Sequence, residues 1–193
     1  MNNQQKSIVI IDFINEIIDS KGKLAGKGYA AFDAKHGTLD NVKKLQEFGR
    51  RNHIPILFVR VGFSSSYVEH PENSPLFGGA KKFGALQLGT SATEFHPKVA
   101  PISGETIITK HRVSAFYGTS LELILKNLQV KEVLLAGVAT DLAVQAAARD
   151  AHDRDFAVTV VSDCCAAANE EDHELSIKTI AKIAKIITLS DLT

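Results

Sequence analysis

Residues 133–144 (VLLAGVATDLAV) decide the fold of this 193-residue chain. Their first four residues end a buried strand that we predict at 132–136, Gly137 lies in a tight turn, and a helix is expected at 142–154. A strand-turn-helix junction presents side chains and backbone N–H groups at the carboxyl end of a sheet. Open α/β folds bind their ligands at that edge, so we expect functional residues at this corner.

Five further segments have the composition of buried strands and alternate with amphipathic segments. Continuous hydrophobicity is typical of strands covered on both faces of a parallel sheet. We expect these strands at 7–13, 54–61, 106–109, 157–161 and 186–188, and further helices at 38–52, 119–128 and 169–184. Right-handed crossovers place the helices on both faces. The prediction is one three-layer α/β/α domain over residues 1–193, of Rossmann type, with a mainly parallel six-stranded sheet.

Composition excludes several classes of function. Lys and Arg number 22, and Asp and Glu also number 22, so the formal net charge is zero. This balance argues against nucleic-acid and polybasic membrane partners, which favour a concentrated positive surface. No run of about 18 apolar residues could span a bilayer, and the first residues lack the apolar stretch of a secretion signal. We therefore expect a cytoplasmic location.

The only two cysteines, Cys164 and Cys165, are adjacent and are expected after the strand at 157–161. Neighbouring side chains on an extended chain point apart, which argues against a disulfide between them. Two cysteines without a matching histidine pair are also a poor zinc site.

Charged groups follow two of the predicted strands. Asp12 follows the apolar run at 8–11, and Lys110 follows the strand at 106–109. Carboxyl ends of parallel strands lie along one edge, so both side chains could meet the turn at 138–143 in one cleft. A buried carboxylate and a lysine each keep the other ionised. Taken singly, either residue could instead be a solvated loop residue or part of a structural ion pair.

The chain resembles the isochorismatase-like cysteine hydrolases over residues 8–189. Similar motifs occur in the expected order at 9–13 (VIIDF), 110–116 (KHRVSAF), 118–119 (GT), 149–151 (RDA) and 162–163 (SD). The turn matches the family pattern Gly-Val-Ala-Thr-Asp-x-Cys-Val, except that Ala143 occupies the position of the attacking cysteine.

The resemblance implies a hydrolase acting on an amide or ureido carbonyl. Asp12 would be the general base that takes the thiol proton, and Lys110 would stabilise the thiolate and the Asp. The N–H groups of Ala139 and Ala143 would line the oxyanion hole. In the family the peptide bond entering the turn is often cis, which would fall at Val138-Ala139.

Ala143 leaves three interpretations open, because a methyl group cannot attack a carbonyl. The first, favoured by the otherwise intact turn, is a Cys→Ala replacement in an amidohydrolase acting on a small amide, ureido or carbamoyl compound, which would leave this chain inactive or strongly impaired. The second is a hydrolase of the isochorismatase type, which cleaves a vinyl ether with Asp12 and needs no thiol. The third is a pseudoenzyme that only binds a small molecule.

Neither a metal nor another cofactor is expected. Nicotinamidases of the same superfamily hold a metal through an Asp-x-His pair and a second His, and residues 59–63 (VRVGF) lack that pair. His70 and His96 are isolated and are more typical of loop structure.

The irregular segment at 62–103 and the segment after Lys110 should form the walls of the substrate pocket. The candidate pocket residues are Phe63, Tyr67, Leu76, Gln87, Arg112, Phe116 and Tyr117. By resemblance we also expect a homo-oligomer.

Overall fold

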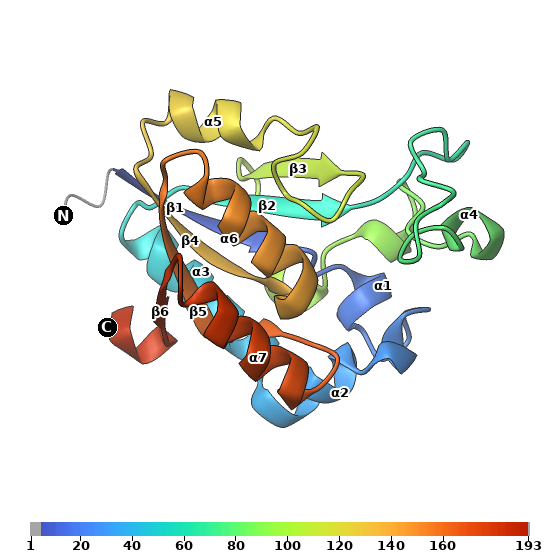
Figure 1. The fold of residues 1–193 in the computed structure, drawn as a ribbon, viewed down its shortest axis with the longest axis horizontal. Helices are drawn as coiled ribbons and strands as arrows, with labels where there is room; N and C mark the ends of the chain where they lie inside the picture. Colours follow the sequence, from blue (N-terminus) through green and yellow to red (C-terminus); the bar gives the residue numbers. More distant parts are fainter. Residues whose placement is uncertain (1–4, 193) are drawn as a thin grey trace.

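All six strands lie in one parallel sheet, seen in the computed structural model, which describes residues 5–192 (Figure 1). The strands are β1 (Lys6–Ile11), β2 (Ile56–Val61), β3 (Thr106–Lys110), β4 (Glu132–Val138), β5 (Ala157–Ala166) and β6 (Lys185–Ile187). Their order across the sheet is β3-β2-β1-β4-β5-β6, and every neighbouring pair is parallel. The predicted α/β fold with a parallel six-stranded sheet is therefore confirmed.

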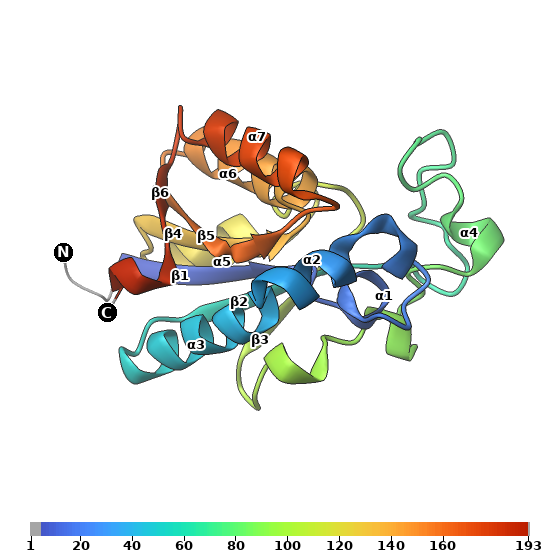
Figure 2. The same cartoon turned by 90° about the horizontal axis from the view of Figure 1, so that it is seen from below.

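Helices cover both faces of this sheet (Figure 2). One face carries α1 (Asn15–Ile18), α2 (Tyr29–His36) and α3 (Thr38–Arg51), and the other carries α5 (Leu121–Asn127), α6 (Gln145–His152) and α7 (Glu170–Ile180). The short helix α4 (Ala80–Phe83) lies in the long segment after β2, beyond the carboxyl edge of the sheet. Shorter turns of 3-10 helix occur at Ala25–Lys27, Ser91–Thr93, Pro97–Val99 and Leu189–Leu192.

The central strand β1 shows why the sequence folds in layers. Ile8 and Ile10 pack into the core on the side of α1–α3, while Val9 and Ile11 pack into the core on the opposite side. All four side chains are fully buried. Successive side chains of a strand point to opposite faces, so an uninterrupted apolar run supplies both cores at once.

Helix ends agree with the polar residues beside them. The side chain of Asn169 accepts a hydrogen bond from Asp172 N at 2.9 Å and caps the start of α7. At the start of α3, Leu39 N donates to the carboxylate of Asp33 at 2.7 Å. Such bonds satisfy N–H groups that have no partner within the helix.

The end of one predicted strand was wrong, and one helix was not predicted. Strand β5 continues to Ala166 instead of ending at Val161, so Cys164 and Cys165 lie within the strand. A register shift between Leu135 and Gly137 lets the extended part of β5 pair with the end of β4. Helix α2 was not predicted, because Phe32 is its only buried residue and its apolar pattern is weak.

No helix described between residues 5 and 192 is long and apolar enough to cross a membrane. The single domain expected over residues 1–193 stays a prediction.

Candidate active site

Asp12 follows β1 at the carboxyl edge of the sheet. Its φ of +61° lies in the left-handed region that non-glycine residues seldom adopt. Asp12 N donates to Val59 O at 2.8 Å, and Oδ1 of Asp12 accepts a 2.7 Å bond from Val61 N. The backbone of β2 therefore fixes both the main chain and the carboxyl group of Asp12. An unusual backbone conformation stabilised in this way is typical of functional positions.

Lys110 ends β3 and completes the environment of Asp12. Its Nζ lies 2.7 Å from Oδ2 of Asp12 and donates to Val113 O at 2.6 Å. The Lys110 residue is only 1% exposed. Burial raises the pKa of Asp12 above its ordinary value, while the charge and hydrogen bond of Lys110 and the bond from Val61 oppose that rise. Burial favours the protonated form of Asp12, and Lys110 favours the ionised form. A carboxyl group balanced in this way can accept a proton and release it again, as a general base must.

The turn after β4 forms the third part of the site. The peptide bond between Val138 and Ala139 is cis, as the resemblance implied. A π-helical turn, Thr140–Val144, precedes α6, and the N–H groups of Leu142 and Val144 both donate to Ala139 O. Ala143 lies between those two donors and is buried.

Gly137 allows this turn to approach β1. A Cβ atom at Gly137 would lie 2.9 Å from Cγ2 of Val144 and 3.0 Å from Cβ of Ile11. Contacts this short require the neighbours to shift, so any side chain at residue 137 would push the turn away from the strand that leads to Asp12. The glycine is needed for this close approach of strand and turn.

These three parts line one cavity of about 690 Å³. Asp12, Lys110, Ala139 and Ala143 all contribute to its wall. The remaining lining is mainly apolar and comes from α1, the segment at 23–29, the segment at 75–86 and the turn itself. A largely apolar cavity with a few convergent polar groups is the usual form of a small-molecule site.

Comparison with known proteins decides the family. A family model described as the isochorismatase domain matches residues 6–191. The chain belongs to the isochorismatase family. Nicotinamidase 3 of Arabidopsis thaliana is 30% identical over 145 residues, which cover 74% of this chain and 71% of that protein.

Solved structures of isochorismatase-family proteins agree with the observed fold. Nicotinamidase PncA from Bacillus subtilis is 26% identical, with a TM-score of 0.80 over 95% of this chain and 99% of that chain. N-carbamoylsarcosine amidase from Thermoplasma acidophilum is 25% identical, with a TM-score of 0.76 over 96% of each chain. The predicted membership is confirmed, and relatives of this chain include amide-cleaving enzymes.

Of the seven pocket residues predicted in this isochorismatase-family chain, Leu76 lines the cavity. Phe63 does not, because its fully buried ring packs edge-on against His70 and Phe77. Tyr67 is also buried, and its hydroxyl donates to Ala85 O at 2.8 Å. Both aromatic residues contact residues that line the cavity but do not line it themselves.

The other four predicted residues are also absent from the cavity lining. The carbonyl of Gln87 accepts bonds from the hydroxyl groups of Thr90 and Thr93, which fixes the loop. Arg112 donates from Nη1 to the carbonyl groups of Glu69 and His111. These residues stabilise the segments around the cavity without lining it.

Phe116 and Tyr117 lie away from the cavity. Phe116 belongs to the core under α5–α7, where the guanidinium of Arg154 lies 5.1 Å from its ring centroid. Tyr117 is 66% exposed. Both residues were expected near the site because they follow Lys110 closely in the sequence. After Val113, however, the chain turns toward the face of the sheet that carries α5–α7.

Several cavity residues were not predicted. Lys23 and Lys27 come from the segment before α2, and Tyr29 is the first residue of α2. Phe77, Phe83 and Leu86 come from the segment around α4. No residue pattern in either segment distinguishes a cavity wall from an ordinary surface loop.

Neither cysteine of the chain lies at the cavity. Cys164 and Cys165 are both buried, and neither lines the cavity with Ala143. Burial raises the pKa of Cys164 and raises that of Cys165 to about 12. A thiolate is the reactive form of cysteine, so we expect neither buried thiol to act as a nucleophile in the folded chain.

Within residues 5–192, no group of three His, Cys, Asp or Glu side chains could hold a metal ion. His70 is buried, with Nε2 lying 2.6 Å from Phe77 O, and it has a structural place in the loop. The absence of a catalytic metal stays a prediction.

Proposed function

We propose that this site is built to hydrolyse a C–N bond of a small amide, ureido or carbamoyl compound, and that Ala143 stops the reaction before covalent attack. The observation that carries the proposal is the buried Asp12–Lys110 pair opening onto the same cavity as residue 143. The names of two relatives, nicotinamidase and N-carbamoylsarcosine amidase, support the same bond type.

A cysteine at residue 143 would complete the reaction. Asp12 would accept the thiol proton, and the thiolate would attack the carbonyl carbon to form a tetrahedral oxyanion. Backbone N–H groups of Ala139 and residue 143 would stabilise that oxyanion. The C–N bond would then break, with the proton passing from Asp12 to the leaving nitrogen. Water would finally release the acid from the thioester.

Lys110 has a separate part in this scheme. Its ammonium keeps Asp12 ionised before the proton transfer and compensates the charge of the thiolate after it. Two of its contacts, to Asp12 and to the carbonyl of Val113, fix its position. Lys110 therefore acts by electrostatic stabilisation and gives up no proton.

The experiment is to assay amine or ammonia release by Ala143→Cys over a panel of amides, ureides and N-carbamoyl compounds. We expect turnover that is absent both from the chain as it stands and from the Asp12→Asn, Ala143→Cys double variant. An inert Ala143→Cys variant that folds normally and binds members of the panel would contradict the proposal.

A second candidate is vinyl-ether hydrolysis by Asp12 without a thiol. Burial favours a protonated Asp12, which could donate to an enol-ether carbon. However, both carboxyl oxygens already accept hydrogen bonds, from Val61 N and Lys110 Nζ, which favour the charged form. Turnover of isochorismate by the unchanged chain, abolished by Asp12→Asn, would support this alternative over amide hydrolysis. If neither version turns over while a ligand still raises the melting temperature, a purely binding role remains.

A further inference from the structure

The charges around the cavity are unevenly compensated. Its charged lining residues are Asp12, Lys23, Lys27 and Lys110. Lys110 is paired with Asp12, so these two charges cancel at the buried end of the cavity. The two remaining lysines are exposed and belong to the segment that precedes α2.

The ammonium group of Lys23 already bonds to other groups of the protein. Its Nζ donates to the carbonyl oxygens of Phe83 and Gly84 at 3.1 and 2.6 Å, and lies 3.8 Å from the buried carboxylate of Glu16. These contacts tie the segment before α2 to the end of α4. Lys23 therefore closes the cavity wall and has a nearby negative charge.

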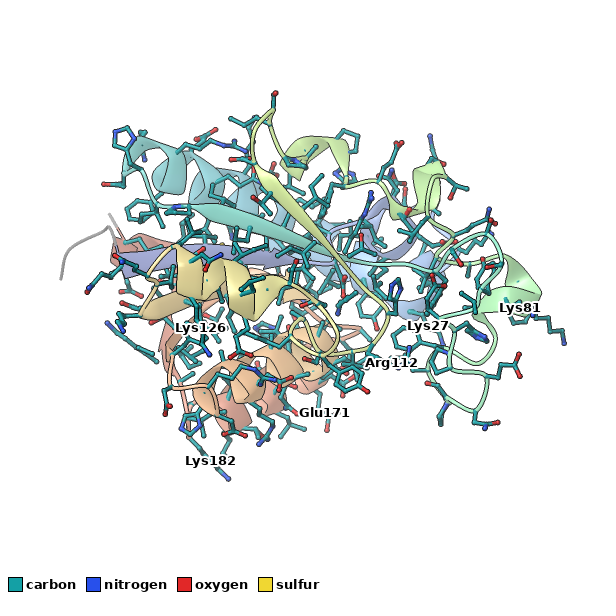
Figure 3. The ribbon with its side chains drawn as sticks, turned by 90° about the horizontal axis from the view of Figure 1, so that it is seen from above. Lys27, Lys81, Arg112, Lys126, Glu171 and Lys182 are labelled. Atoms are coloured by element: carbon teal, nitrogen blue, oxygen red, sulfur yellow. The ribbon has the colours of Figure 1, made fainter. Side chains whose placement is uncertain are left out.

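Lys27 differs from Lys23 in having no such partner. Among the described residues, no carboxylate oxygen lies within ion-pair distance of its Nζ. In Figure 3, Lys81 projects outward from α4, whereas Lys27 lies nearer the sheet. The uncompensated positive charge on the cavity lining is thus that of Lys27.

Tyr29, two residues after Lys27, also lines the cavity and adds a hydrogen-bond donor to its wall. Burial raises the pKa of its hydroxyl, and the charges of Asp141 and Asp172 raise it further. The phenol therefore stays protonated and can donate. Asp141 and Asp172 do not line the cavity. They therefore raise the pKa of Tyr29 without making the charge of the cavity lining negative.

We propose that Lys27, with Tyr29, forms a carboxylate subsite at the mouth of the cavity, so that the site takes amides whose apolar body ends in a carboxylate. This proposal rests on the proposed function only for the end of the substrate that is cleaved. The buried pair and the turn receive the carbonyl, apolar residues such as Leu24 and Phe77 contact the body, and Lys27 binds the anionic end.

The test is equilibrium binding to the chain as it stands, because Ala143 prevents covalent turnover. The probes are the monoamides of adipic, pimelic and suberic acids, each compared with its neutral diamide by titration calorimetry. We expect the best-fitting monoamide to bind about three- to fivefold more tightly than its diamide, the size of a partly exposed ion pair. Added salt should reduce that preference.

The matched variants are Lys27→Gln, Lys27→Arg and Lys81→Gln, where Lys81 is an exposed lysine outside the cavity lining. Lys27→Gln should remove the preference for the monoamide, while Lys27→Arg and Lys81→Gln should keep it. Equal binding of monoamide and diamide, a preference that survives Lys27→Gln, or no binding of either probe would overturn the proposal.

Failure of the proposed function would look different. If Ala143→Cys hydrolyses neither compound but the unchanged chain still binds monoamides through Lys27, the carboxylate subsite stands and amide hydrolysis does not. If Ala143→Cys hydrolyses diamides as well as monoamides and Lys27→Gln changes neither KM, the subsite fails while the hydrolase proposal stands.

Discussion

Lys110 crosses the end of β2 and places its Nζ 2.7 Å from Oδ2 of Asp12, although their strands β3 and β1 are not neighbours in the sheet. Val61, at the end of the intervening strand, donates its N–H to the other carboxyl oxygen at 2.7 Å. Three strands are therefore joined at one buried carboxyl group. The pair affects both the stability of the carboxyl edge and the chemistry of the cavity.

Lys110→Met should destabilise the protein by about 3–5 kcal/mol, because it leaves Asp12 as a buried charge without a partner. The double variant Asp12→Asn, Lys110→Met should recover part of that loss. Urea unfolding measures both. The control is Lys126→Met, which removes an exposed i,i+4 ion pair with Glu122 and should cost less than about 1 kcal/mol. Equal losses of unfolding free energy for Lys110→Met and Lys126→Met would show that the buried ion pair stabilises the protein no more than an exposed one.

Gly28→Ala should be strongly destabilising. Gly28 has a φ of +102°, and a Cβ there would lie 2.1 Å from Ala168 O. The backbone conformation alone should cost about 1–3 kcal/mol, and the clash would also displace the cavity segment that contains Lys27. Gly26→Ala is the control, because its Cβ would meet nothing within 4 Å. The prediction is wrong if both variants have the same unfolding midpoint.

His173 should make the fold sensitive to mild acid. Burial lowers its pKa, the charge of nearby His36 lowers it further and that of Glu174 opposes the shift. The unfolded chain therefore binds a proton at higher pH than the folded chain. This contribution is complete above the ordinary histidine pKa of about 6.5 and is lost as pH falls below it.

The variant that checks this is His173→Asn. The ring Nδ1 of His173 lies 2.9 Å from Oγ1 of Thr140 in the active-site turn, so the variant keeps a polar group there but removes the titration. Melting temperatures measured across this pH range should fall less steeply for His173→Asn than for the parent. If the melting temperatures of the two proteins fall equally with pH, His173 is not the cause of the acid sensitivity.

The two native thiols should be unreactive in the folded protein. Both are buried in β5, and the raised pKa values leave almost no thiolate. A thiol reagent at mildly alkaline pH should modify neither cysteine until the chain is unfolded. In Ala143→Cys the reagent should add one label, at residue 143. Rapid labelling of Cys164 or Cys165 in the native chain would contradict the observed burial.

The site was predictable from sequence where physical rules link distant residues. Apolar runs ending in Asp12 and Lys110 imply parallel strands whose carboxyl ends share an edge, and the structure brings these residues together at the turn containing Ala143. The rule needs only strand direction and continuous hydrophobicity, both of which the sequence contains.

The extent of β5 and the cavity wall were not predictable in this way. Ser162 and Asp163 interrupt the apolar run, but the hydroxyl of Ser162 donates to Ile187 O and a carboxylate oxygen of Asp163 accepts from Leu189 N. These tertiary bonds let polar residues continue the strand. The wall depends similarly on contacts such as those of Lys23 with Phe83 and Gly84, which no local pattern encodes.

A cysteine at residue 143, beside Asp12 and Lys110, should be the nucleophile for covalent attack on the amide carbonyl. Intact-mass spectrometry of Ala143→Cys, quenched with acid during reaction with an amide substrate, tests it most directly. We predict a mass increase equal to the acyl group, mapped to the peptide containing residue 143 and absent when Asp12→Asn is added. Turnover of the amide by Ala143→Cys without any adduct, or an adduct on Cys164 or Cys165, would contradict the account.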